Sequence, residues 1–170
     1  MPMEIKDLSD HMIWADMTIW SEVRKIGQDK DTKSIFDLLF HLHSVQHAYL
    51  SIWNNESLNY LRNIKFNKLD EVYEWALDFH KKYRIFINDL DDDKMQMEIK
   101  IPWTGQLERK LGKPLKNSSL IQTIYQVIMH STYHRGQINK EIRKIGGEPP
   151  LTDFIYWIWS GKPDVETIIK

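Results

Sequence analysis

The chain has 170 residues, with 23 Lys and Arg against 24 Asp and Glu, so its formal net charge at pH 7 is -1. This balance excludes a general electrostatic attraction to nucleic acid or to an anionic membrane, and the absence of cysteine excludes disulfides, thiolate metal ligands and a cysteine nucleophile. Because no apolar run has the length of a signal peptide or a membrane-spanning helix, we expect one soluble, cytoplasmic domain over residues 1–170.

Two helices are predicted in the first third of the chain. The first covers residues 5–26, where apolar side chains recur every three or four positions and so share one face. These side chains are Leu8, Met12, Ala15, Ile19, Val23 and Ile26, and Gly27 follows at a natural stop. The second helix covers residues 34–53, with Ser34 and Asp37 as a predicted capping box.

The third and fourth helices are separated by a segment with a different period. The third covers residues 69–90, with an apolar stripe made of Val72, Trp75, Ala76, Phe79, Tyr83, Phe86 and Leu90. The fourth covers residues 119–145. Asn117 or Ser118 caps its start, and the Gly146-Gly147 pair ends it.

Between these two helices, apolar and polar residues alternate over residues 95–101, which predicts a strand. Thr104-Gly105 then predicts a turn, with a second short strand before Pro114. A small β-hairpin is therefore expected here. Near the C-terminus, a short apolar helix is predicted over residues 152–159, with Thr152 as its cap.

Four helices with one apolar face each predict an all-α fold in which the faces meet in a four-helix bundle. Each helix has about 20 residues and is therefore about 30 Å long. The long segment between the third and fourth helices permits a crossover connection.

The strongest chemical signal is the pair His130 and His134 on the fourth helix. Side chains four residues apart lie one turn apart on the same side of a helix, a spacing that suits two ligands of one metal ion. Val127 and Ile138 place the pair on the apolar stripe, which indicates that it faces the bundle interior. Neutral imidazole suits zinc, nickel, iron or copper, and suits calcium or magnesium poorly. Two unrelated histidines are the simpler interpretation of this spacing alone. Gly136 argues mildly against it, since a glycine inside a helix suggests close packing there.

A third ligand is expected from the second helix, which carries three histidines. Periodicity mildly favours His41, which shares a side with other apolar residues, over His43 and His47. At least two of the three must be partly exposed or hydrogen-bonded histidines without a metal. His11 and His80 have no partner at ligand spacing, so we interpret both as structural or surface residues.

Three segments resemble the DinB/YfiT-like superfamily. The second-helix motif is Leu38-Leu39-Phe40-His41-Leu42 with Gln46, Tyr49 and Leu50, and the fourth-helix motif is His130-Ser131-Thr132-Tyr133-His134-Arg135-Gly136-Gln137. The tail Gly147-Glu148-Pro149-Pro150-Leu151-Thr152-Asp153-Phe154-Ile155 also resembles the family. One departure is Gln126, where many relatives carry a further histidine.

The resemblance implies a four-helix bundle with a crossover and a divalent metal held by His41, His130 and His134. It also implies, as in some relatives, metal-dependent transfer chemistry on a small molecule with a low-molecular-weight thiol as co-substrate. A non-catalytic, metal-binding stress-response module and a metal-dependent hydrolase are the alternatives. Zinc or nickel is the expected ion, and a symmetric homodimer is the expected assembly.

Other residues around the motif have less specific predicted roles. Tyr133, Gln137 and Tyr49 are pocket candidates, and each is more simply a packing or supporting residue. Glu141 is one turn past Gln137, but the sequence does not identify this or any other carboxylate as a general base. Arg135 is expected to pair with an acid such as Asp153 and fix the tail.

Overall fold

The all-α fold is confirmed in a computed structural model, which describes residues 3–27 and 29–167. The predicted domain of residues 1–170 therefore extends beyond the described residues at both ends. The elements in chain order are α1 (Met3–Val23), α2 (Lys33–Trp53), α3 (Asn59–Asn63), α4 (Leu69–Asn88), α5 (Asp92–Gln96), β1 (Glu98–Ile99), α6 (Thr104–Leu111), β2 (Ser118–Ser119), α7 (Leu120–Lys144), α8 (Phe154–Trp159) and the 3₁₀ helix η1 (Val165–Thr167).

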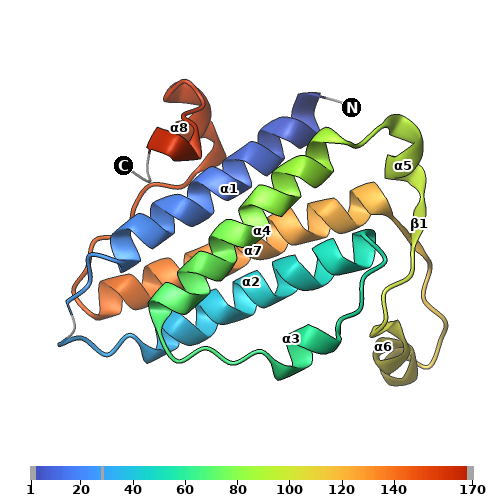
Figure 1. Cartoon of the computed structure of the whole chain (residues 1–170), viewed down its shortest axis with the longest axis horizontal. Helices are drawn as coiled ribbons and strands as arrows, with labels where there is room; N and C mark the ends of the chain where they lie inside the picture. The colour runs from blue at the N-terminus through green and yellow to red at the C-terminus, as the bar shows by residue number, and fades with distance from the viewer. Residues whose placement is uncertain (1–2, 28, 168–170) are drawn as a thin grey trace.

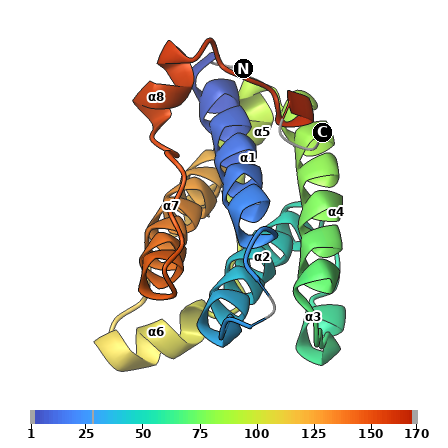
Figure 2. The ribbon, with the colours of Figure 1, turned by 90° about the vertical axis from the view of Figure 1, so that its left-hand side faces the viewer.

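The four long helices α1, α2, α4 and α7 form the bundle (Figure 1). Helix α2 packs against α7 and α4, and α1 packs against the same two helices. Figure 2 shows α7 and α4 on opposite sides, with α1 and, below it, α2 between them. Consecutive long helices are thus diagonal at α1–α2 and again at α4–α7, which is the crossover arrangement that the long third connection permits.

The bundle core is built from the predicted apolar faces of all four helices. Met12, Ala15, Ile19 and Val23 of the α1 stripe are buried, while the flanking Leu8 and Ile26 are half-buried. The largest fully buried side chain is Trp20, also on α1. Burying one large apolar side chain contributes about 1.5–3 kcal/mol, so these faces are sufficient to hold the helices together.

The helix ends differ from the prediction by a few residues. Helix α1 ends at Val23 rather than at Ile26, and α2 begins after Thr32 without the predicted capping box. Asp37 instead forms an ion pair with Lys33 at 2.7 Å. The start of α7 is capped by Ser119, whose backbone N–H donates to Gln122 Oε1 at 2.9 Å.

The connection between α4 and α7 contains a two-stranded sheet, whose first strand lies within the predicted residues 95–101 and whose second strand does not lie where it was predicted. β1 and β2 are antiparallel, with Glu98 opposite Ser119 and Ile99 opposite Ser118. The second strand therefore follows Pro114 rather than preceding it. Thr104 and Gly105 begin helix α6 instead of forming a turn, and Gly112, in the left-handed conformation with φ of 66°, ends it.

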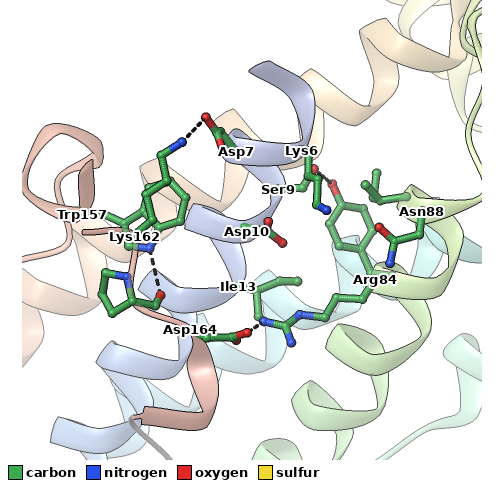
Figure 3. Close-up of a pocket in the computed structure, with 13 residues that line it drawn as sticks. Lys6, Asp7, Ser9, Asp10, Ile13, Arg84, Asn88, Trp157, Lys162 and Asp164 are labelled. Carbon is green, nitrogen blue, oxygen red and sulfur yellow. Dashed lines mark hydrogen bonds and ion pairs between the residues drawn. The ribbon is translucent and has the colours of Figure 1, made fainter. Parts of the chain in front are cut away.

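The C-terminal segment is held against α1 and α4 by ion pairs, shown in Figure 3. Lys162 contacts Asp7 at 2.7 Å, and Arg84 contacts Asp164 at 2.6 Å. These groups line a cavity of about 280 Å³. Among the described residues, no helix is both long and apolar enough to span a membrane.

Candidate metal centre

His130 and His134 lie one turn apart on α7, and their rings converge as the spacing predicted. The two Nε2 atoms are 3.1 Å apart, and the ring centroids are 4.3 Å apart. Two nitrogen ligands at about 2.0–2.1 Å from a tetrahedral zinc ion are about 3.3 Å apart. The pair is therefore arranged closely enough to share one ion.

His41 reaches this pair from α2, the helix that packs against α7. Its ring centroid is 4.7 Å from that of His134 and 5.3 Å from that of His130. One ring nitrogen from each of the three lies within 4.8 Å of the other two. The structure thus brings together the three histidines that the family resemblance selected.

The three histidines differ in how far each is buried. His134 is buried and His130 is half-buried, while His41 is exposed. The prediction that the α7 pair faces the interior therefore holds fully for His134 and in part for His130. The group opens toward solvent on the His41 side, where a further ligand could enter.

Gln137 holds the ring of His134 in one orientation and one tautomer. An amide oxygen only accepts, so Nδ1 of His134 donates to Gln137 Oε1 at 2.6 Å. The Nε2 atom of neutral His134 then keeps its lone pair for the centre. Gln137 Nε2 in turn donates to the hydroxyl of Tyr133 at 3.1 Å.

His41 and His130 are held in their neutral, ligand-competent form. Partial loss of hydration and the adjacent His134 lower the pKa of His41. Burial, together with His134 and His41, lowers the pKa of His130 to about 4. Nδ1 of His130 is buried without a hydrogen-bond partner among the described residues, so the contact of its Nε2 with His134 is the one hydrogen bond of that ring within the described part of the chain.

A second group, Asp16, His43 and His80, also lies within 4.8 Å, but His43 has no lone pair left for an ion. Nε2 of His43 accepts from Trp20 Nε1 at 3.0 Å, and its Nδ1 donates to Gln46 Oε1 at 2.7 Å. A neutral imidazole has one donor and one acceptor, so none remains for an ion. This group is a hydrogen-bonded core network, in which Nδ1 of His80 has no partner among the described residues.

Asp16 is the centre of that network, and it corrects the prediction for Arg135. Arg135 Nη1 contacts Asp16 Oδ1 at 2.7 Å with both side chains buried, so it does not pair with Asp153. Gln46 Nε2 donates to Asp16 Oδ2 at 2.7 Å and to Ser131 Oγ at 3.0 Å. Burial alone would raise the pKa of Asp16, but Arg135 and His80 lower it below its usual value.

The remaining histidines have structural contacts. His47 is buried, stacks on Trp75 with ring centroids 4.2 Å apart, and bonds to the Trp75 carbonyl at 2.9 Å. His11 is buried and bonds to the Thr152 carbonyl at 2.9 Å. Both observations agree with the interpretation of these residues as ordinary core histidines.

Three further sequence predictions have clear outcomes. Glu141 pairs with Lys144 at 3.1 Å, and Tyr49 packs edge-on against Trp103 at 5.5 Å. The expectation of close packing at Gly136 is wrong, because a β-carbon there would meet nothing within 4 Å. Asp16 and Gln46 were missed as a buried pair, and their only sequence signal is a polar residue on an otherwise apolar helix face.

Comparison with known proteins identifies the family of the chain. The chain is 19% identical over 174 residues to "Protein DinB" of Bacillus subtilis (strain 168), an alignment that covers 92% of this chain and 95% of that protein. The DinB family model matches residues 1–165. The chain therefore belongs to the DinB family.

Proposed function

We propose that this protein is a metal-dependent transferase that acts on a small molecule and uses a low-molecular-weight thiol as its co-substrate. The observation that carries the proposal is the three-histidine group that is closed on the α7 side and exposed at His41. Catalytic metal sites keep one coordination position open, whereas structural sites are usually closed by four protein ligands.

The donor set fits one divalent transition-metal ion. His41, His130 and His134 offer three neutral nitrogens, which suit zinc or nickel better than calcium or magnesium. A divalent cation bound by neutral ligands alone supplies its full charge to lower the pKa of a thiol or water at the open position.

The protein side chains around the group prepare it for such a ligand. Gln137 orients His134, and Tyr133, 65% exposed, keeps its own hydroxyl proton available because its oxygen accepts from Gln137. The Tyr133 ring lies edge-on to His134 at 5.1 Å. We propose that the Tyr133 hydroxyl donates a hydrogen bond to the substrate beside the centre.

Metal analysis of the purified protein tests the ligand set. We expect one equivalent of zinc or nickel per chain, with sharp losses in His41→Ala, His130→Ala and His134→Ala. His47→Gln is the control, because its contacts lie with Trp75 outside the group. Full occupancy in His130→Ala would contradict the assignment. Retention in His41→Ala with loss in His43→Ala would mean that only the third ligand is wrong.

A thiol-conjugation assay with and without chelator tests the reaction. We expect conjugation of an electrophile such as 1-chloro-2,4-dinitrobenzene with a small thiol, lost with the metal and restored on reloading. Conjugation that survives complete metal removal would contradict the catalytic role of the centre. Ester hydrolysis without thiol transfer would identify a hydrolase, and stoichiometric metal without either reaction would identify a non-catalytic binding module.

A further inference from the structure

A groove of about 630 Å³ lies between α2, α3 and α6. Pockets for small molecules typically have volumes of about 300–1,000 Å³ and mostly apolar walls with a few polar groups. The apolar wall here is formed by Val45, Ala48, Leu58, Leu61, Pro102 and Trp103. Trp103 is 42% exposed and makes an edge-to-face contact with Tyr49, so it presents an apolar surface to the groove.

The groove continues the surface that carries the exposed histidine of the metal centre. Ser44, Val45 and Ala48 line it, and they follow His41 by three, four and seven residues on the same side of α2. All three are incompletely buried, whereas the neighbouring Leu42, His43 and Gln46 are buried. One helical turn is about 5.4 Å, so the groove begins about one turn from His41.

The side chains that line the groove carry positive charge and no negative charge. Arg62 on α3 and Arg109 on α6 both line it, and no Asp or Glu does. Neither guanidinium has a hydrogen bond or ion pair within the described part of the chain. The cavity in Figure 3 differs, because Lys162 and Arg84 are neutralised there by Asp7 and Asp164.

Two unpaired guanidinium groups at an apolar groove are suited to an anion. Arginine binds carboxylate and phosphate oxygens through charge-assisted hydrogen bonds, often two at a time. The apolar wall would pack against the rest of the ligand, which is therefore expected to be apolar. The anionic group at the arginines would keep the other end of the molecule directed along α2 toward His41.

We infer that this groove is the substrate subsite of the metal centre and binds a small anionic molecule with an apolar body, its carboxylate or phosphate held by Arg62 and Arg109. The inference rests on the proposed function, because it assigns the substrate class for that same site. It adds a specificity determinant outside the three histidines.

Calorimetric titration with matched probes tests the inference. The probes are 4-phenylbutyrate, 4-phenylbutyl phosphate and the neutral 4-phenylbutan-1-ol, added to metal-loaded protein and to chelator-treated protein. We expect both anions to bind on the order of tenfold tighter than the alcohol, because charge-assisted hydrogen bonds to guanidinium groups are stronger than neutral ones. The relative affinity of the two anions identifies the carboxylate or the phosphate as the preferred group.

Charge-matched variants locate the anion. Arg62→Gln and Arg109→Gln should each weaken anion binding, and the double variant should bind the anions no better than the alcohol. Arg143→Gln, an exposed residue in the last turn of α7, removes the same charge outside the groove and should leave binding unchanged. Circular dichroism checks that each exposed substitution leaves the fold intact.

The outcomes separate this inference from the proposed function. An anion preference that persists in the double variant would overturn the inference, as would equal binding of the alcohol. Anion binding that depends on the metal and not on the arginines would place the anion at the centre, which overturns the subsite and leaves the proposed function standing. Arginine-dependent binding by protein that takes up no metal would support the subsite and refute the proposed function.

Discussion

Gln137 determines which nitrogen of His134 is free, and a single substitution tests this role. We predict that Gln137→Leu lowers metal affinity by about 10- to 100-fold, the usual effect of losing a group that orients a ligand. Gln137→Glu should retain the affinity, because a carboxylate still accepts from Nδ1–H of His134. Competition with a fluorescent zinc chelator measures both dissociation constants.

Equal loss of affinity in the leucine and glutamate variants would contradict the orienting role. It would mean that the size of the side chain, rather than its acceptor, matters. Unfolding curves in urea provide the control, since Gln137 is only half-buried and neither variant should change stability strongly.

The residue scale also shows what the sequence could predict about the site. The spacing of His130 and His134 was sufficient to predict that their side chains lie together, because both are on one helix, which fixes their relative position. Periodicity favoured His41 only mildly, since His43 and His47 are also on apolar parts of α2 and are in fact more buried. The pairing of Asp16 with Arg135 joins residues on different helices, so no local pattern reveals it.

At the scale of elements, the Asp16–Arg135 ion pair connects α1 to α7 inside the core. We predict that Asp16→Asn and Arg135→Met each lower the free energy of unfolding by about 3–5 kcal/mol, because each leaves a buried partner uncompensated. The double variant should lose less than the sum of the two. Urea unfolding of the wild type and the three variants gives the coupling energy.

Additive losses in this double-mutant cycle would show that the two side chains stabilise the bundle independently. Arg143→Met is a matched control, because Arg143 is exposed on the same helix. Its substitution should change the free energy of unfolding by less than about 0.5 kcal/mol.

The long helices were predictable, as was the strand over residues 98–99, whereas α6 and β2 were not, for a physical reason. The long helices bury wide apolar faces that repeat over five or more turns. Helix α6 has only Leu107 and Leu111 one turn apart, both exposed, with Gly112 as a C-terminal stop. Gly105 in its first turn suggested a turn instead. β2 was missed because two serines carry no apolar alternation, and its position follows from β1 lying beside the start of α7.

For the whole molecule, buried neutral histidines predict a pH-dependent stability. Burial, only partly offset by hydrogen bonds and nearby acids, lowers the pKa of His43 to about 3 and that of His47 to about 4. In the unfolded chain both titrate near 6.5. Between these values the unfolded state binds more protons, so stability decreases as the pH falls below about 6.5, by about 1.4 kcal/mol per pH unit for each group.

Urea unfolding between pH 7.5 and 4.5 measures this dependence. His47→Gln, whose amide can still bond to the Trp75 carbonyl, should show a shallower dependence than the wild type. An unchanged slope in this variant would exclude His47 as a contributor. Acid therefore weakens the fold and the metal centre together, and a chelator at neutral pH should remove metal while helical circular dichroism persists.

The predicted symmetric homodimer also belongs to this scale. Exposed apolar side chains are present on α7 and around α8, including Met129, Leu151, Ile155 and Trp159. Exposed apolar area of this kind favours self-association. Light scattering at micromolar concentration should give twice the chain mass of 20.4 kDa, and a monomer mass would exclude the dimer.

The pairing of an early helix, α2, with a late helix, α7, has a consequence for biosynthesis. His41 is made early, but its two partner histidines are on α7, near the end of the chain. Chains emerge from the ribosome at about 5–20 residues per second. Several seconds therefore pass between the synthesis of His41 and that of α7, the helix against which α2 packs. A nascent or truncated chain lacking α7 would contain one of the three proposed ligands, so we expect any metal binding at this site to occur only after α7 has been synthesised.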